Sequence, residues 1–429
     1  MIEERLIGKT TYGGEVIVLK ADKPYEIPAI RIHISTQRRL KESNTKIITT
    51  TEEFIEYINR HPEAAKTYVK KILRYHHGDI GEMDTNGIYF KSVSRLFTFI
   101  SWIPIGANRG IKGVGTERSM RYTTQEEQIT IQNQTIKKVN RESVELYRKL
   151  IEEKIPKEDA RYILPLTTKT EEIIHIQMGR DLAKYANYLK DEPFEEAKTI
   201  GKLLLKWNEE ENGFTLPTIE KPTTRIPQTV KEEDRQKEIL KRFLADKQNK
   251  IYYDPYTQSL IWNTKRSIAS LHQDVRNRQV YFWWPSWESI INNNKFYIPK
   301  TIPKELIEEI KEHYYRRIEI SKRLYKKGEQ QMAVYTLPMG KKIDVYCALY
   351  GNENIYETIR LRACMKAQHE IRRQYRLIMK TIEKRFPRRL GARCETEGLC
   401  FEPQKEKCPL YQQHIARKAN QKPAENHLT

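Results

Sequence analysis

The spacing of apolar residues predicts a mixture of strands and helices in the first half of the chain. Residues 14–36 are rich in β-branched side chains and are interrupted by prolines, a composition that favours strands. Residues 52–75 instead carry apolar side chains at helical spacing. The other elements expected in this half are a strand at 87–93, a glycine-rich loop at 106–115 and helices at 141–155 and 170–208.

A change in composition divides the chain after about residue 210. Residues 211–233 contain three prolines, several threonines and few large apolar side chains, which is typical of a connector between domains. The last residues are polar, and we expect them to be disordered. The predicted parts are an N-terminal domain at 1–210, a linker at 211–239, a C-terminal domain at 240–411 and a disordered tail at 412–429.

An internal repeat relates the two predicted domains. Residues 157–189 align with residues 330–362 at a constant offset of 173 positions, so that Leu164-Pro165 matches Leu337-Pro338. In both copies a long helical pattern leads into the Leu-Pro pair. A register that persists over this length indicates an ancient duplication.

The composition suits a soluble globular protein, with 38% hydrophobic and 31% charged residues. No apolar run is long enough for a membrane span. The N-terminus carries acidic residues where a secretory signal would need a basic start and an apolar core. We therefore expect a cytoplasmic protein without a membrane partner.

The net charge of +20 leaves two interpretations open. Excess positive charge favours polyanions such as nucleic acid or nucleotide phosphates. Lys and Glu are interspersed along the chain, however, which equally suits the charge-rich surface of a thermophilic protein.

Three of the five cysteines, Cys394, Cys400 and Cys408, lie near the C-terminus. Their spacing lacks the close pairs of ligands that zinc sites use. We expect reduced thiols and no bound metal, and the role of this cluster stays open.

Two stretches of the second copy resemble flavin-dependent thymidylate synthases (ThyX). The sequence LRACMKAQHEIR, residues 361–372, is similar to that family's helix signature L-R-x4-A-Q-x-E-I-R. The triplet Arg276-Asn277-Arg278 is followed by Ser286 after seven residues, which resembles the family's R-H-R-x7-S motif. Gln273 stands three residues before the triplet, as the family's glutamine does.

The first copy carries other parts of the same family pattern. Glu117, Ser119 and Arg121 resemble the E-x-S-x-R-Y end of the signature loop, and Arg161 resembles the arginine of the A-R-x-x-L-P element. His76-His77-Gly78 with Glu82 is similar to the family's H-H-G-x-x-x-E turn.

The resemblance implies a mixed α/β fold of the α+β kind, with two tandem ThyX-like domains, each a small sheet packed with long helices. It also implies reductive methylation of dUMP to dTMP with FAD, using NADPH and methylenetetrahydrofolate as co-substrates. Arginine forks are well suited to phosphate recognition, and the arginine matching Arg362 would polarise the pyrimidine. The implied site residues are catalytic Arg362; substrate-binding Gln273, Ser286, Glu117, Ser119, Arg121, Arg161 and Arg362; and cofactor-binding Arg276, Asn277, Arg278 and Arg180.

Family active sites form between subunits of a tetramer. The resemblance therefore implies self-association into a pseudo-tetramer, a dimer of two-domain chains, with dUMP as the small-molecule partner. Nucleic acid is a possible further partner that this activity does not require.

Each copy also departs from the family pattern. Counting back from Ser119 puts Arg109-Gly110-Ile111 where R-H-R is expected, and Leu189 replaces the ring-orienting arginine. The second copy has Trp284, Glu288 and Val334 at positions where Glu, Arg and Arg are expected. No pairing of one loop with one set of helices restores every expected residue.

These departures support an alternative function. A diverged ThyX-like protein could bind a nucleotide or nucleic acid, either modifying uridine in a polymer or acting without catalysis. The aromatic run at 281–284 would stack a flavin or base in such a site, or would form a buried cluster.

Overall fold

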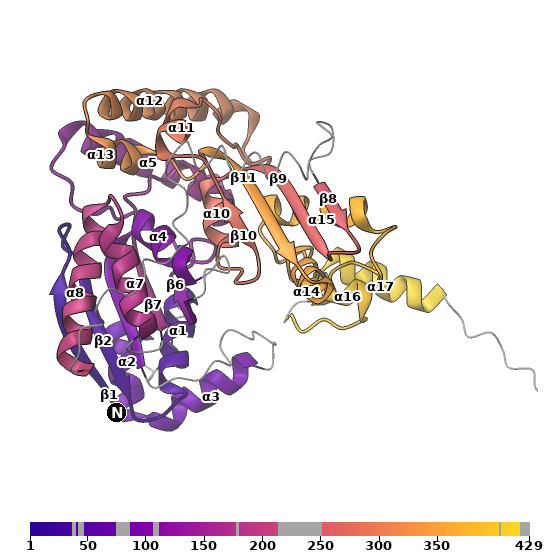
Figure 1. Ribbon diagram of the computed structural model, residues 1–429, viewed down its shortest axis with the longest axis horizontal. Helices are drawn as coiled ribbons and strands as arrows, with labels where there is room; N and C mark the ends of the chain where they lie inside the picture. Colours follow the sequence, from indigo (N-terminus) through magenta and orange to yellow (C-terminus); the bar gives the residue numbers. More distant parts are fainter. Residues whose placement is uncertain are drawn as a thin grey trace, which may run out of the picture.

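The computed structural model describes most of the chain. The described residues are 1–36, 40–41, 47–73, 86–105, 111–176, 180–212, 251–402 and 405–420. Their helices and strands form two halves (Figure 1). One continuous hydrophobic core takes side chains from both halves. No helix within these ranges is long and apolar enough to cross a membrane.

The N-terminal half is built on an antiparallel sheet in the order β1-β2-β5-β7-β6. Its strands are β1 (Ile2–Lys9), β2 (Glu15–Ala21), β5 (Asn86–Ser94), β6 (Gly113–Glu117) and β7 (Lys169–Ile176), and a separate small pair joins β3 (Leu40–Lys41) and β4 (Ile47–Ile48). Its helices are α1 (Glu26–Thr36), α2 (Thr51–Arg60), α3 (Pro62–Leu73), α4 (Arg95–Ile105), α5 (Gln134–Glu152), α6 (Lys157–Ala160), α7 (Arg180–Asp191) and α8 (Glu195–Asn212).

Both faces of this sheet are covered, as the side chains of β2 show. Val16 and Val18 join the large core, to which α4, α7 and α8 also contribute, whereas Ile17 and Leu19 join a second core beneath α1, α2 and α3. Because alternate side chains of a strand point to opposite faces, a strand buried on both sides is apolar throughout.

The C-terminal half is built on an antiparallel sheet in the order β10-β11-β9-β8. Its strands are β8 (Ile251–Asp254), β9 (Ser259–Ser267), β10 (Tyr281–Trp283) and β11 (Lys342–Tyr350). Its helices are α10 (Ile268–Asp274), α11 (Trp287–Asn292), α12 (Ile307–Lys326), α13 (Gln330–Thr336), α14 (Asn352–Arg362), α15 (His369–Ile382), α16 (Arg393–Thr396) and α17 (Pro409–Asn420). Helices packed with two antiparallel sheets confirm the expected α+β class.

Several sequence-based expectations are confirmed and two are wrong. The strand at 87–93 lies in β5, and the helical pattern at 52–75 forms α2 and α3, which are separated at Pro62. Residues 26–36 form α1 instead of a strand; this helix is buried on all sides over Glu26–Ile34, so its pattern carries no helical period. Residues 169–176 form β7 instead of a helix, and isoleucines dominate its buried positions.

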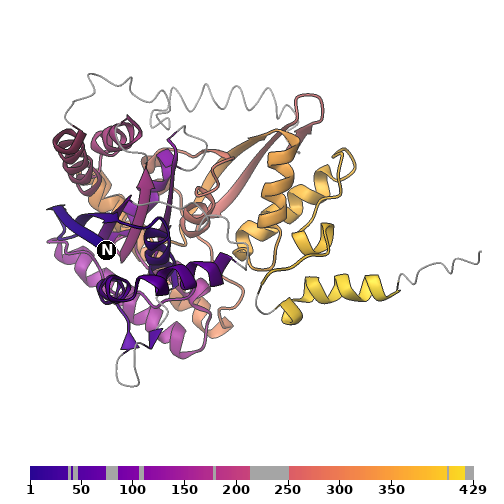
Figure 2. The same ribbon diagram turned by 90° about the horizontal axis from the view of Figure 1, so that it is seen from below.

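The expected boundaries fall largely outside the described residues. The linker at 211–239 begins in the last turn of α8, and residues 213–250 are not described. Of the loop expected at 106–115, residues 106–110 are not described and β6 begins at Gly113. The tail expected to be disordered from residue 412 instead continues as helix α17 to Asn420, projecting from the C-terminal half in Figure 2.

The offset of 173 positions extends far beyond the repeat seen in the sequence. Moving β5 forward by 173 residues reproduces the bounds of β9, and the same shift places the start of α5 on the start of α12. The strand registers agree as well, because Ser94 faces Lys169 and Ser267 faces Lys342. The two halves are therefore structural repeats from residue 86 onward.

The repeats meet around a pseudo-two-fold axis at the two Leu-Pro pairs. Pro165 pairs with Pro338, its own counterpart, in an antiparallel bridge. The amide of Leu166 donates to the carbonyl of Leu337 at 3.2 Å, and the amide of Met339 donates to the carbonyl of Leu164 at 2.8 Å. These two bonds exchange under the offset of 173, so the chain folds as an internal dimer.

Two crossed hydrogen-bond triads link the repeats. In the first, Glu196 accepts from the hydroxyl of Ser94 and, at 3.1 Å, from that of Tyr335 in the other repeat. In the second, Glu370 accepts from Ser267 and, at 2.9 Å, from Tyr162. The serines and tyrosines are related by the offset of 173, so each repeat's Glu-Ser pair holds the other's tyrosine.

The Glu196 carboxyl gives the fold a pH dependence. Burial raises the pKa of Glu196 from 4.5 to about 7. Between pH 4.5 and about pH 7, the folded chain therefore keeps the carboxyl proton, whereas the unfolded chain has released it. Stability should therefore fall as pH rises from about 4.5 to about 7, by about 3 kcal/mol. Glu196→Gln should remove this fall, measured as urea-unfolding free energies at pH 5 and pH 8. An undiminished pH difference in the variant would contradict the assignment.

Candidate functional site

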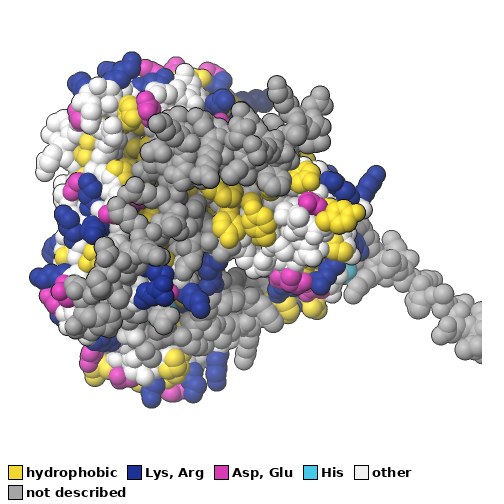
Figure 3. Space-filling model, viewed as in Figure 1, with side chains coloured by type: hydrophobic (Ala, Val, Ile, Leu, Met, Phe, Trp, Pro, Cys, Tyr) yellow, Lys and Arg dark blue, Asp and Glu magenta, His cyan; other side chains and the backbone are white. Residues whose placement is uncertain are grey.

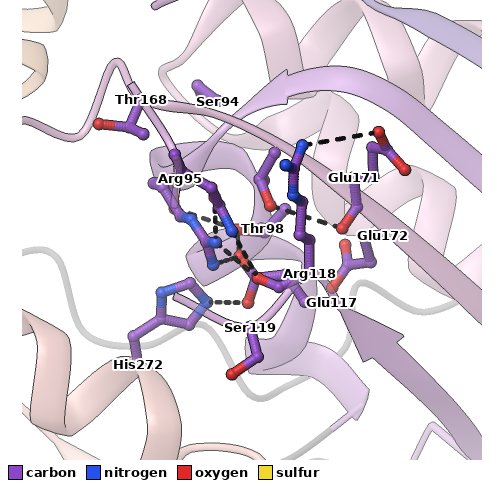
Figure 4. Close-up of polar contacts among 12 residues, drawn as sticks. Ser94, Arg95, Thr98, Glu117, Arg118, Ser119, Thr168, Glu171, Glu172 and His272 are labelled. Atoms are coloured by element: carbon purple, nitrogen blue, oxygen red, sulfur yellow. Dashed lines mark hydrogen bonds and ion pairs between the residues drawn. The ribbon is translucent and has the colours of Figure 1, made fainter. Parts of the chain in front are cut away.

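The buried carboxylate of Glu117 lies where the two repeats meet. Glu117 ends β6, and its side chain is fully buried. Arg95 and Thr98 of α4 donate to one carboxylate oxygen, as Figure 4 shows for Arg95. Arg276 donates to the other oxygen, and His272 Nε2 lies 3.1 Å from it (Figure 4). Glu117 thus joins cationic groups from both repeats.

A second carboxyl lies beside Glu117 but has the opposite ionisation. Glu117 faces Glu172 across the β6–β7 ladder. Arg95, His272 and Arg276 together hold the pKa of Glu117 well below its usual range despite its burial. Burial, followed by the charge of Glu117, raises the pKa of Glu172 well above its usual range. Of the two carboxyl groups, Glu117 therefore carries the negative charge that the surrounding cations share. Burial also lowers the pKa of His272.

Further contacts bring the predicted substrate-binding residues of both copies together. Arg161, which is 8% exposed, directs Nη2 to Oε1 of Gln273 at 3.5 Å. Arg121 pairs with Glu158 at 2.9 Å and donates to the carbonyl of Lys366 at 2.8 Å, in the turn that follows α14. Arg161 and Arg121 therefore reach from the first repeat to the second.

Arg362 ends α14 and is oriented by a buried carboxylate. Its Nε lies 3.3 Å from Oδ1 of Asp274, while Arg266 binds the other oxygen of that carboxylate. Asp274 directly follows Gln273 on α10, so the same helix positions Arg362 and a predicted substrate ligand. The Arg362 side chain remains 23% exposed.

The remaining predicted residues differ in placement. Ser119 follows β6 and accepts a hydrogen bond from the amide of Arg121 at 3.2 Å. Arg278 directs Nη1 to the carbonyl of Gly113 at 3.4 Å, across the repeats, whereas Asn277 faces Thr358 at 3.5 Å. Arg180 is exposed at the start of α7, and no hydrogen bond or ion pair within the described ranges joins it to the other predicted residues.

Ser286 lies apart from Arg276 and Arg278. It caps α11 and lines a cavity of about 240 Å³ together with Ile100, Ile103 and Val334. The motif predicts Ser286 in one site with Arg276 and Arg278, whereas the structure places Ser286 in this cavity and Arg276 against Glu117. The three-residue strand β10 and a turn lie between Arg278 and Ser286, and the chain crosses there from one inter-repeat site to the other.

This crossing changes how the degenerate motifs combine. The helical part of the loop motif comes from the second copy, as Gln273 and Arg276, and the strand-following part comes from the first copy, as Glu117, Ser119 and Arg121. No whole loop needs to be intact, because each site takes half a loop from each repeat. We call this set the charged composite site; its members are Glu117, Ser119, Arg121, Arg161, Gln273, Arg276, Asn277, Arg278 and Arg362.

The counterparts of these residues form the cavity that contains Ser286. The offset of 173 relates Gln273 to Ile100, Arg276 to Ile103 and Arg161 to Val334. Thr116 faces Ile173, and Trp283 faces Tyr346, 173 positions later, so Trp284 is the counterpart of Glu117. The first copy's equivalent of R-N-R is accordingly Ile103-Pro104-Ile105, which corrects the placement at Arg109-Gly110-Ile111. One site keeps the charged residues, and the other has lost nearly all of them.

Sequence reasoning missed three residues of the charged site. Arg95, His272 and Glu172 all touch or adjoin Glu117, and all three are buried. His272 directly precedes Gln273 and Arg95 directly follows Ser94, but neither position belongs to the motif that was recognised. Their common partner becomes visible only when the repeats are in contact.

Some predicted residues cannot be placed. His76, His77 and Glu82 lie outside the described residues. The aromatic run is divided, because Phe282 and Trp284 are buried in the large core while Tyr281 and Trp283 stack on each other with ring centres 6.1 Å apart.

The cysteine cluster is larger than its spacing indicated. Burial, followed by Glu395 and the nearby thiols of Cys364, Cys400 and Cys408, raises the pKa of Cys394 to about 12. No group of metal-binding side chains occurs within the described ranges.

Comparison with known proteins agrees with this geometry. The family model described as thymidylate synthase complementing protein matches residues 18–206 and again residues 217–388. No curated protein matches the chain. Each matched segment covers one of the two repeats, and together they span most of the chain. The chain therefore belongs to the thymidylate synthase complementing protein (ThyX) family, as a tandem arrangement of two family domains.

Proposed function

We propose that the chain is a flavin-dependent thymidylate synthase that converts dUMP to dTMP at the charged composite site. One observation carries the proposal: of the described motif residues that survive in the two degenerate copies, all but Ser286 and Arg180 lie together in one site between the repeats. Random loss from an inactive protein would have spread the survivors evenly over both sites.

Arg276 fits an anionic cofactor such as FAD. Its guanidinium lies 5.1 Å from the ring centre of Trp102 and donates through Nη2 to Glu117. Its Nε is buried and has no hydrogen-bond partner among the described residues, although the side chain as a whole is 31% exposed. A phosphate oxygen would satisfy this donor. Arg278 lies two residues further along the chain, is exposed and adds a second cation.

The remaining residues suit a nucleotide monophosphate. Arg161 and Arg121 direct their guanidinium groups from the first repeat to the second, Ser119 adds a hydroxyl two residues before Arg121, and Gln273 supplies an amide. Bidentate arginine contacts fix a phosphate in one orientation. Arg362, held by Asp274, would polarise a pyrimidine carbonyl so that no protein nucleophile is needed. The bound flavin supplies the redox chemistry, with NADPH and methylenetetrahydrofolate as co-substrates.

Self-association into a dimer of two-domain chains belongs to the same proposal. The internal two-fold already reproduces one subunit contact of a family tetramer, so a pseudo-tetramer would need only one further interface.

Nucleic-acid binding receives less support from the surface. On the face shown in Figure 3, Lys and Arg side chains lie over both halves with Asp and Glu among them. A single basic stripe, which a nucleic-acid-binding surface would favour, is not present among the described residues of this face.

Complementation of thymidine auxotrophy by the full chain tests the proposal. The wild-type chain should support growth without thymidine and should be yellow when purified with FAD. Arg362→Ala should abolish growth because the pyrimidine carbonyl loses its fixed cation. Arg360→Ala is the matched control on the same helix, since Arg360 pairs with Glu357 and Glu397 and lies over the ring of Tyr356, and it should grow normally. A colourless wild-type protein that fails to complement would overturn the proposal in favour of the binding alternative.

A further inference from the structure

The counterpart of the charged composite site has become a cavity with a different lining. It encloses about 240 Å³ between the repeats, where α11, α12 and α13 of the second meet α4 and the α7–α8 turn of the first. We call it the aromatic cavity. Five aromatic side chains line it: Tyr188, Phe194, Trp284, Trp287 and Tyr325.

Aromatic contacts fix the walls of this cavity. The ring of Trp287 stands perpendicular to that of Phe194, with centres 6.0 Å apart. Phe99, the counterpart of His272, holds Trp284 at 5.6 Å and Trp287 at 6.4 Å. Where the charged site has a buried ion cluster, this site therefore has packed rings with a defined orientation.

The charges of the lining are reversed relative to the charged site. Glu288 stands where the first repeat has Arg121, Val334 replaces Arg161 and Ile103 replaces Arg276. Glu192 adds a second carboxylate, and no Lys or Arg is among the described residues that line the cavity. Among the described residues of the lining, phosphates and carboxylates would therefore meet like charges and aromatic ring faces, without a cation to bind them.

We propose that the aromatic cavity binds a small planar aromatic cation. Indole and phenol rings attract a cation to their faces, and the exposed carboxylate of Glu288 adds a favourable field. The volume is below that of most drug-sized sites, which suits a ligand of about two fused rings. The proposal goes beyond the thymidylate activity and does not depend on it, because it concerns the site that has lost the nucleotide-binding arginines.

Three probes of matched shape distinguish charge from ring stacking. Binding of 1-methylquinolinium, 1-methylnaphthalene and 1-naphthoate to the full chain is followed by quenching of tryptophan fluorescence. The cation should bind at least about 10-fold more tightly than the neutral probe, and the anion most weakly. Equal affinities, a preference for the anion, or no binding of the cation would each overturn the proposal.

Two variants locate the binding. Glu288 is exposed, so Glu288→Arg should fold normally while restoring the residue type of the charged site. It should weaken 1-methylquinolinium about 10-fold or more and improve 1-naphthoate. Trp283→Ala is the matched control, because Trp283 lies outside the cavity beside Tyr281 and Tyr346, and it should leave both affinities unchanged. Unchanged binding by Glu288→Arg, or equal losses in both variants, would place the probe elsewhere and overturn the proposal.

Discussion

Replacing Arg161 by alanine is expected to weaken dUMP binding about 10- to 150-fold. A charge-assisted hydrogen bond contributes about 1.5–3 kcal/mol, and each 1.4 kcal/mol corresponds to a tenfold change in affinity. Arg161 is almost fully buried, and its Nη2 already faces Gln273 of the other repeat, so its guanidinium is held in place before the nucleotide arrives. Calorimetric titration of dUMP in the presence of FAD measures the change.

The pseudo-symmetric position provides the control for this experiment. Val334 occupies the place of Arg161 in the aromatic cavity. Val334→Ala removes a buried side chain at the equivalent position of the other repeat without touching the charged composite site, so dUMP affinity should stay as in wild type. If both variants bind dUMP as the wild type does, the phosphate does not lie at Arg161. If both lose affinity equally, the effect comes from loosening of the repeats and not from a lost phosphate contact.

The repeat could be recognised from sequence because its register is continuous. The Leu-Pro pairs and the helices before them keep the offset of 173, and a hydrophobic pattern of this length fixes the order of elements. Helix α1 was missed because burial on every side removes the period that identifies a helix. Strand β7 was missed because its apolar run also fits the start of a long helix.

The composite site could not be assembled from sequence because it depends on which repeat supplies each half of a loop. Arg276 and Ser286 are close in the chain, yet the first contacts Glu117 and the second lines the opposite cavity. The two repeats meet in the antiparallel contact of Pro165 with Pro338, and this arrangement, which the sequence does not show, brings half of each loop to each site. Each motif is incomplete by itself. Together the two motifs build one site that retains its charged residues and a second site in which those residues are replaced.

The division between the sites also explains the residues that match no family motif. If the charged composite site alone binds phosphates, as we propose, its counterpart is free to exchange charged for apolar side chains, as at Trp284 and Val334. The buried cations of the charged composite site must then be held in position by a counter-charge within that site. Glu117 performs this role, since it contacts Arg95 and Arg276 from opposite repeats.

Removing the Glu117 carboxylate is accordingly expected to destabilise the fold by about 3–5 kcal/mol. That is the usual cost of deleting one member of a buried ion pair, because the cations that remain are desolvated without a counter-charge. Glu117→Ala should show this loss in urea unfolding at pH 7. Glu126→Ala, which breaks the exposed pair with Arg148, should cost less than about 1 kcal/mol.

The dependence on pH separates this electrostatic role from simple packing. The pKa of Glu117 is lowered in the folded chain, so its charge stabilises the fold above the unfolded value of 4.5, and that stabilisation is lost as pH falls toward the folded value. The difference between wild type and Glu117→Ala should therefore be largest near neutral pH and should shrink below about pH 4.5. A difference that stays constant from pH 7 to pH 3 would mean that Glu117 acts by filling space. The cations from the two repeats would then owe their placement to the surrounding core and not to the shared carboxylate.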